Sequence, residues 1–167
     1  MLPITLNPHT LKAGLAGAGE ARERRAALLA EAGVEARLLP VDAPDEVLAG
    51  LQLLFVAGVP EGEARVLAAR ARALGVLVNV EDVLPLCDFH VPAIVRRGDL
   101  LLTASTGGQV PGLSRALRES LAVQFGPEWT ERLRQLSLAR ARWRSEGLTP
   151  AEVSQMVRAH VMGEGWL

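Results

Sequence analysis

The stretch Leu11-Lys-Ala-Gly-Leu-Ala-Gly-Ala-Gly-Glu-Ala-Arg22 joins a short apolar run to the start of a helical pattern. Gly17 and Gly19 fall at the junction, which is the context of a dinucleotide-binding fingerprint. Glycine is needed there because the backbone must turn tightly and approach a pyrophosphate, to which the helix N-terminus offers unpaired N–H groups. Arg22 departs from the pattern, since the third fingerprint position is usually small. The same glycines are compatible with a plain flexible turn, so the loop alone leaves both interpretations open.

Outward from this loop, short apolar runs alternate with stretches of helical period. The pattern predicts strands at residues 34–39, 52–57 and 76–80 and helices at 20–32 and 61–74. In the second helix we expect Val66, Leu67 and Leu74 to face inward. Strands that alternate with helices indicate a parallel sheet with right-handed crossovers, which is an α/β fold of the Rossmann type.

The pattern changes near residue 90. Apolar runs at 89–95 and 100–104 flank Arg96-Arg-Gly-Asp99, which predicts a β-hairpin. Helices are expected at 111–125, at 128–144 and after Thr149, where Pro150 and Glu152 complete a capping box. We therefore predict a Rossmann domain over 1–91, a small α/β region over 92–126 and a helical tail over 127–167.

Composition narrows the class of protein. The net charge is −1, which supplies no basic field for a nucleic-acid partner. Cys87 is the single cysteine, so an intrachain disulfide is excluded and a reducing compartment fits. The N-terminus lacks the pattern of a secretory signal, and no apolar stretch is long enough to span a bilayer. We expect a cytoplasmic protein that does not associate with membranes.

Three segments resemble the precorrin-2 dehydrogenase/sirohydrochlorin ferrochelatase family, which includes the N-terminal module of siroheme synthases. They are Gly17-Ala-Gly-Glu-Ala-Arg-Glu-Arg-Arg25; Asn79-Val-Glu-Asp82 with Cys87-Asp-Phe-His-Val-Pro-Ala-Ile94; and Arg96-Arg-Gly-Asp-Leu100 with Ala104-Ser-Thr-Gly-Gly108 and Pro111-Gly-Leu-Ser-Arg-Ala-Leu-Arg118. The order and spacing of the second and third segments make them more specific than a lone glycine loop. The resemblance covers most of the span from residue 2 to about residue 120.

The resemblance implies an NAD-binding Rossmann domain, a central dimerisation region and a helical tail, assembled as a homodimer. It implies that the chain is a stand-alone enzyme that oxidises precorrin-2 to sirohydrochlorin with NAD⁺. Some members of the family also insert Fe²⁺. Two other functions stay open: a non-catalytic module that senses NAD, and a chelatase only. Arg22 and the apolar segment Ala57-Gly-Val-Pro60 favour weaker cofactor binding than is usual in the family.

Asp82 matches the catalytic aspartate of this family and follows the strand 76–80, at the edge where open α/β sheets bind ligands. A strand-end aspartate can equally cap a turn. Strand alternation would place Glu81 on the face opposite Asp82. Asp42 lies about 20 residues after the glycine loop, as expected for the group that binds the adenosine ribose, and NAD is therefore preferred over NADP. Pro40 and Pro44 flank Asp42, so it is also compatible with a simple turn residue, and the choice between NAD and NADP stays open.

The remaining expected site residues fall into two groups. The expected cofactor contacts are Gly17, Ala18, Gly19, Glu20, Ala21, Val41, Asp42, Gly58 and Asn79. The substrate contacts that the resemblance suggests are Ser105, Thr106 and Arg115, with Arg96, Arg97 and Arg118 as further candidates for binding substrate carboxylates. Several of these side chains are equally compatible with a solvated helix face or with dimer contacts. No metal site is expected, because His90 and His160 lack ligand spacing. Cys87 and Asp88 are expected to shape the structure rather than to react.

Overall fold

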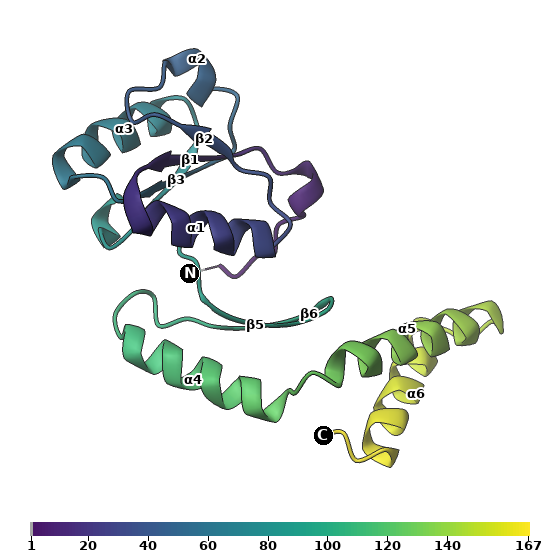
Figure 1. Ribbon diagram of the computed structural model, residues 1–167. Helices are drawn as coiled ribbons and strands as arrows, with labels where there is room; N and C mark the ends of the chain where they lie inside the picture. Colours follow the sequence, from purple (N-terminus) through teal and green to yellow (C-terminus); the bar gives the residue numbers. More distant parts are fainter. Residues whose placement is uncertain (1) are drawn as a thin grey trace. The chain divides into compact units, whose positions relative to one another are not determined.

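The computed structural model describes residues 2–167 and divides the chain into two compact units, one ending at Val91 and one beginning at Pro92. The first unit contains a four-stranded sheet in the order β2-β1-β3-β4, with every neighbouring pair parallel (Figure 1). Its strands are β1 (Ala13–Gly17), β2 (Arg37–Leu39), β3 (Leu53–Ala57) and β4 (Leu77–Val80). The predicted Rossmann-type parallel sheet is confirmed.

Helices cover both faces of this sheet. The helical elements are the short η1 (Pro8–Thr10), α1 (Gly19–Glu31), α2 (Asp45–Leu48), α3 (Glu61–Ala73) and the short η2 (Leu84–Leu86). Phe55 packs in a core cluster with Leu29 of α1, whereas its neighbour Val56 packs in a second cluster with Leu67 of α3. Because successive strand side chains point to opposite faces, β3 supplies both cores at once. This explains why all five of its residues are buried.

The inward face of α3 differs from the prediction. Leu67 is buried as expected, but Val66 is 61% exposed and Leu74 is 37% exposed. Ala64, Ala68 and Ala71 share the buried face with Leu67. These four positions follow the helical period, and their mostly small side chains let the helix approach the sheet closely. The expectation for Val66 and Leu74 was wrong because it followed side-chain size rather than the alanine stripe.

Strand β2 is shorter than the predicted 34–39 segment. Gly33 has φ 74°, its N–H donates to the Ala30 carbonyl, and the Val34 N–H donates to the Leu29 carbonyl. These two bonds form a Schellman motif that ends α1 and leaves Val34 outside β2. Val34 and Ala36 still pack against the α1 cluster, so their apolar character reflects burial beside the sheet rather than strand pairing.

The second unit begins with a hairpin of β5 (Ala93–Arg97) and β6 (Leu100–Ala104), which pair antiparallel. Gly98 in the two-residue turn has φ 57°. The hairpin is as predicted, but its first strand starts at Ala93 rather than at residue 89. Phe89 belongs to the first unit, where its ring lies edge-on to that of Phe55 at a centroid distance of 5.3 Å.

Three helices complete the second unit: α4 (Pro111–Gln124), α5 (Trp129–Ser145) and α6 (Pro150–Gly163). Each lies within a few residues of its predicted range. The predicted capping box at α6 is confirmed, because the Glu152 N–H donates to the Thr149 hydroxyl and the Thr149 N–H donates to the Glu152 carboxylate. Among residues 2–167, no helix combines the length and the apolar character needed to cross a membrane.

Candidate functional site

The glycine loop lies where the strand order of the first sheet reverses. The chain runs from β1 to β2 on one side and then crosses to β3 on the other, and open α/β sheets bind ligands at such a switch point. A Cβ on Gly17, whose φ is 130°, would lie 1.8 Å from the Ala57 carbonyl oxygen. A Cβ on Gly58 would lie 2.2 Å from the Ala18 carbonyl oxygen. The loops after β1 and β3 therefore touch backbone to backbone, which requires both glycines.

Gly19 has a different role in this loop. Its φ is 66°, and no heavy atom lies within 4 Å of the position that a Cβ would occupy. Ala18 is the N-cap of α1 and provides no side-chain hydrogen bond to the first turn. The first N–H groups of α1 therefore have no capping side chain, and the Cβ position of Gly19 beside them is open, which fits the pyrophosphate of a dinucleotide.

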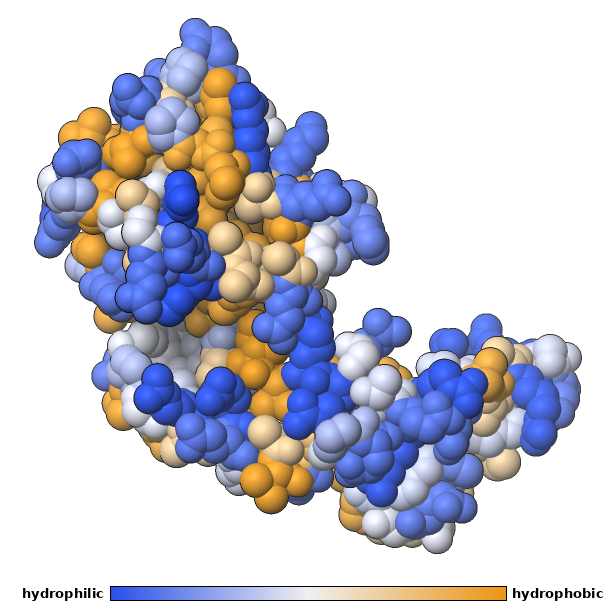
Figure 2. Space-filling view, viewed as in Figure 1, coloured by the Kyte–Doolittle hydropathy of each residue, from blue (hydrophilic) through white to orange (hydrophobic). Residues whose placement is uncertain are grey.

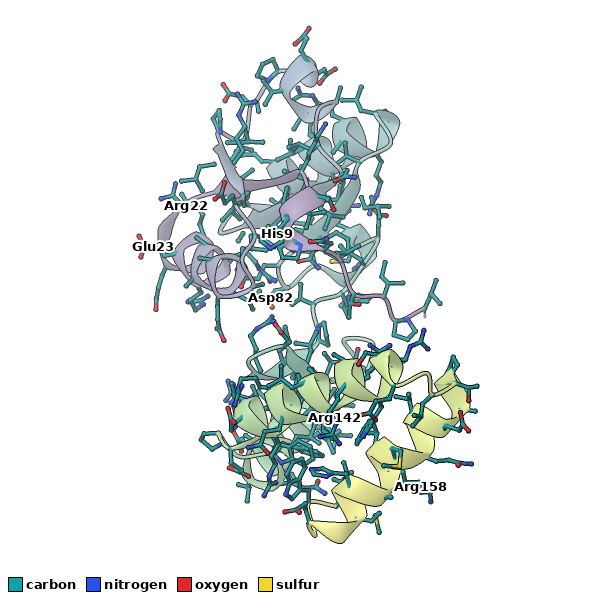
Figure 3. All side chains as sticks on the ribbon, turned by 90° about the vertical axis from the view of Figure 1, so that its right-hand side faces the viewer. His9, Arg22, Glu23, Asp82, Arg142 and Arg158 are labelled. Carbon is teal, nitrogen blue, oxygen red and sulfur yellow. The ribbon has the colours of Figure 1, made fainter. Side chains whose placement is uncertain are left out.

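Arg22 does not interfere with this packing. The residue of α1 that meets the β3 loop is Ala21, whose Cβ lies 3.4 Å from the Cβ position of Gly58. The side chain of Arg22 lies on the outer side of α1 (Figure 3). The small residue that the fingerprint needs is thus supplied one position earlier than the motif suggests.

Val41 and Asp42 line an open concavity of about 550 Å³ between the end of β2 and the start of α3. Glu63 and Arg70 belong to the same lining. Arg70 donates to Asp45 at 2.6 and 2.9 Å and to the Ala43 carbonyl at 2.6 Å, so its guanidinium is already engaged by the protein. The exposed carboxylate of Asp42 stays available to a hydroxyl donor.

The loop after β4 is held firmly at its base. Asp88 accepts from the Val78 N–H at 2.9 Å and from Arg72 at 2.9 Å, and its own N–H donates to the Val78 carbonyl. The Cys87 thiol donates to the Val80 carbonyl at 3.1 Å. Asn79 is buried, and its amide donates to the Phe89 carbonyl at 2.9 Å. Asn79, Cys87 and Asp88 thus fold the segment 81–89 back along β4.

Asp82 lies in this loop with φ 62°, and it is the single non-glycine residue with positive φ among residues 2–167. An L-residue pays a conformational cost there, and such outliers persist only where the surrounding structure enforces them. The clamp by residues 79, 87 and 88 provides that enforcement. The sequence predicted that strand alternation places Glu81 and Asp82 on opposite faces. Alternation does not apply to them, because β4 ends at Val80 and the turn sets the directions of both side chains. Asp82 is exposed at the carboxyl edge of the sheet.

Arg25 is a site residue that the sequence analysis did not single out. It lies on the inner face of α1 with its guanidinium carbon 5.6 Å from the centroid of the Phe55 ring. Burial lowers the pKa of Arg25, while the nearby carboxylates of Glu81 and Asp82 raise it in part. The signal was present in the sequence, because Arg25 interrupts the apolar helical face that begins at Ala21 and continues at Leu29.

The expected substrate residues lie in the second unit. Ser105 and Thr106 precede α4; their hydroxyls accept from the N–H groups of Gly107 and Val110, and the Thr106 hydroxyl lies 3.1 Å from that of Ser114. Arg115 is exposed on α4. These three residues share one turn and one helix start, separate from the unit that contains Asp82 and the glycine loop.

Arg97 serves the second unit itself rather than presenting a free guanidinium. Its Nε donates to the Phe125 carbonyl at 2.8 Å and its Nη2 to the Ala122 carbonyl at 3.1 Å. It therefore caps the C-terminal end of α4, where carbonyl groups lack helical partners.

Within residues 2–167 no three His, Cys, Asp or Glu side chains gather as a metal site. His160 packs edge-on to Trp166 at a centroid distance of 5.2 Å.

Several siroheme synthases are similar in sequence to this chain. The siroheme synthase of Methylococcus capsulatus is 31% identical over 137 residues, covering 70% of this chain and 29% of the relative. The siroheme synthase of Nitrosococcus oceani is 33% identical over 164 residues, covering 86% of this chain and 34% of the relative. The siroheme synthase of Pseudomonas aeruginosa is 31% identical over 188 residues, covering 90% of this chain and 40% of the relative. The chain thus spans between 29% and 40% of the length of these relatives.

A solved structure, SirC, precorrin-2 dehydrogenase, has the same fold, with a TM-score of 0.69 over 95% of this chain and 88% of that one at 18% identity. This structure confirms the expected fold, and the similarity to the siroheme synthases confirms the resemblance identified in the sequence. The family model NAD_binding_7, described as "Putative NAD(P)-binding", matches residues 4–93, which is more than half of the chain. The chain belongs to this NAD(P)-binding family.

Proposed function

We propose that this protein is an NAD-dependent precorrin-2 dehydrogenase that forms sirohydrochlorin in siroheme biosynthesis. The observation that supports this most is Asp82, an aspartate held in a costly backbone conformation at the same sheet edge as a glycine loop suited to a dinucleotide. The names of the relatives point to the same pathway.

The reaction removes a hydride and a proton from the substrate. The nicotinamide cofactor, when bound, accepts the hydride. Asp82 is the group that we propose accepts the proton, because its carboxylate is exposed at the sheet edge and its loop is immobilised by the clamp at Asn79, Cys87 and Asp88. A fixed carboxylate avoids the cost of ordering the base in each turnover.

The residues of the first unit are proposed to hold the cofactor in three places. The N–H groups at Gly19 and Glu20 face the pyrophosphate, Gly17 and Gly58 permit its close approach, and Asp42 binds the adenosine ribose. Arg70 is paired with Asp45, and Asp42 and Glu63 add negative charge to the same concavity. Among the described residues that line this concavity, Arg70 is the single cation and is already paired, so a 2′-phosphate would meet negative charge there, which is why we propose NAD rather than NADP.

An Asp42→Asn variant tests this choice. Removing the charge while keeping the size should weaken NAD⁺ binding several-fold and leave NADP⁺ binding equal or improved, because repulsion of the phosphate is relieved. Isothermal titration of both nucleotides measures the ratio. An unchanged ratio of the two affinities would contradict the role given to Asp42.

We further propose that residues 92–126 form the dimerisation region of a homodimer and that 127–167 form its helical tail. Helix α4 has no buried residue, and Leu113 and Leu117, one turn apart, are 49% and 43% exposed. Apolar surface is visible among hydrophilic side chains over the second unit (Figure 2). A second copy would cover this face. Light scattering should give twice the monomer mass; a monomer at micromolar concentration would contradict the dimer.

The catalytic role is tested by an Asp82→Asn variant. Asparagine tolerates the left-handed conformation but cannot accept a proton. We expect the rate of sirohydrochlorin formation to fall by at least about a hundredfold, as is typical of lost general-base catalysis, with unchanged NAD⁺ affinity. Near-normal turnover of precorrin-2 by this variant would remove Asp82 from the mechanism. Normal NAD⁺ binding without any oxidation by the wild-type protein would favour the non-catalytic sensing module.

A further inference from the structure

Arg25 is a half-buried cation without an anionic partner in the described part of the chain. Neither an ion pair nor a hydrogen bond from its guanidinium joins it to any of residues 2–167, although the arginines at 24, 65, 70, 72, 118, 132, 134 and 142 each form an ion pair. Partial burial of a guanidinium is costly unless acceptors replace the lost water. Burial accordingly lowers the pKa of Arg25, and the nearby carboxylates of Glu81 and Asp82 offset this effect only in part.

The aromatic contact fixes how this cation is presented. The guanidinium carbon lies over the Phe55 ring at 5.6 Å, and Phe89 buttresses Phe55 edge-on. Stacking uses the face of a guanidinium and leaves the N–H groups along its edge available for a planar acceptor. A carboxylate matches that edge with two parallel hydrogen bonds.

The expected direction of the side chain is toward the sheet edge that carries Asp82. Long side chains on a helix lean toward its N-terminus, and α1 begins at the carboxyl edge of the sheet with Gly19. The carboxylates of Glu81 and Asp82, which follow β4 at this edge, lie close enough to act on Arg25 electrostatically. Among residues 2–167, neither carboxylate forms an ion pair or hydrogen bond with Arg25, so the guanidinium is not consumed by the proposed base.

We propose that Arg25 is a substrate-binding residue that receives a carboxylate side chain of the tetrapyrrole beside Asp82. The inference rests on the proposed function, which supplies a substrate rich in carboxylates. Such a contact would orient the macrocycle relative to the base, and an unpaired cation would favour an acidic substrate over a neutral one. Its loss should weaken tetrapyrrole binding without weakening NAD⁺ binding.

The test compares Arg25→Gln with Arg24→Gln. Arg24 is the adjacent arginine on α1, with a side chain that is 60% exposed and a loose contact to Glu20 at 3.5 Å, so it controls for removal of one positive charge. Sirohydrochlorin binding is followed by its absorbance, together with NAD⁺ affinity and the melting temperature. We expect Arg25→Gln to weaken sirohydrochlorin binding about tenfold or more and Arg24→Gln to leave it within about twofold.

Arg25→Lys serves as a second variant if the glutamine variant does not fold. Lysine keeps the charge but loses the stacked planar fork, so an intermediate loss of affinity is expected. Wild-type affinity for sirohydrochlorin in Arg25→Lys and Arg25→Gln would overturn the inference, as would a wild-type protein that binds no sirohydrochlorin. Binding that depends on Arg25 in a protein that fails to oxidise precorrin-2 would support the inference while contradicting the proposed function.

Discussion

The two units of this chain differ in how they are stabilised. Of the 25 buried apolar residues among the described positions, 20 lie before Pro92 and only Val95, Trp129, Trp143, Val153 and Val161 lie after it. The first unit buries apolar surface on both faces of a sheet, whereas the second relies on caps, stacked aromatic rings and arginine contacts. Burial on this scale supplies most of the folding free energy of a domain.

This difference in core packing indicates which of the two units can hold a strained functional residue in place. The first unit has enough core to hold a strained aspartate and a backbone-to-backbone glycine contact. In the second unit, Arg132 is stacked between Trp129 and Trp166 at 5.2 and 5.0 Å, and Arg97 caps α4, so polar groups do much of the packing. A unit built in this way is suited to being completed by a partner, as the proposed dimer requires.

The largest effect is expected for Gly17→Ala in the first unit. The added Cβ would overlap the Ala57 carbonyl oxygen, whereas a Cβ on Gly147 of the second unit, where φ is 92°, meets no atom within 4 Å. We expect Gly17→Ala to lower the free energy of unfolding by about 3 kcal/mol or more, and Gly147→Ala to lower it by roughly 1 to 2 kcal/mol from backbone strain alone. Urea denaturation measures both, and equal losses would show that close packing at the switch point is not special.

Next in size is Leu54→Ala compared with Leu117→Ala. Leu54 is fully buried in the first unit, so its truncation should cost about 2 to 5 kcal/mol. Leu117 is 43% exposed in the chain by itself. If the dimer covers it, its truncation should lower the melting temperature more strongly at low protein concentration. Thermal scans over a hundredfold range of concentration check this, and a concentration-independent loss for Leu117→Ala would contradict the comparison.

A smaller effect is expected for Thr149→Ala, which removes the capping box of α6. Loss of an N-cap costs typically about 1 kcal/mol. Because the second unit has few buried residues, hydrogen exchange of α6 should accelerate while that of β3 stays unchanged. Acceleration spread equally over both units would indicate that they unfold together rather than as separate parts.

The smallest effect concerns acid sensitivity of the second unit. Hydrogen bonds from Arg134 and Gln135 lower the pKa of Glu131 from 4.5 to about 2. A carboxyl group with a lowered pKa contributes stability at pH values above its ordinary pKa. That contribution is lost as the pH falls from about 4.5 to about 2. Glu131 and Arg134 are exposed, so water screens most of the effect. An NMR titration should give a midpoint near 2 that rises in Arg134→Gln; an unshifted midpoint in the variant would contradict the contact.

Much of this fold could be predicted from the sequence because its signals are local. The alternation of strands and helices predicted the parallel sheet, the Arg96–Asp99 segment the hairpin, and Thr149 with Glu152 the start of α6. The inward residues of α3 and the length of β2 could not be predicted, since they depend on how closely a helix approaches the sheet and on a Schellman motif that consumes Val34.

The residues of the candidate site also separate into those that local sequence signals identify and those that depend on tertiary contacts. Gly17, Gly19 and Asp82 could be identified by motif and position, but the left-handed backbone of Asp82 arises from the clamp formed by residues that follow it. Arg97 looked like a candidate for substrate binding until its carbonyl partners on α4 were known. Arg25 interrupts the apolar face of its helix, but its proposed role depends on the Phe55 ring beneath it and on the lack of a partner along residues 2–167, and neither can be seen in the sequence.

The central claim is that this chain oxidises precorrin-2 with NAD⁺. The most direct measurement is the absorbance of anaerobic precorrin-2 mixed with the purified protein, with and without NAD⁺. The account predicts that the sirohydrochlorin spectrum develops only when NAD⁺ is present, in step with NADH formation. An unchanged precorrin-2 spectrum with folded protein and saturating NAD⁺ would contradict it.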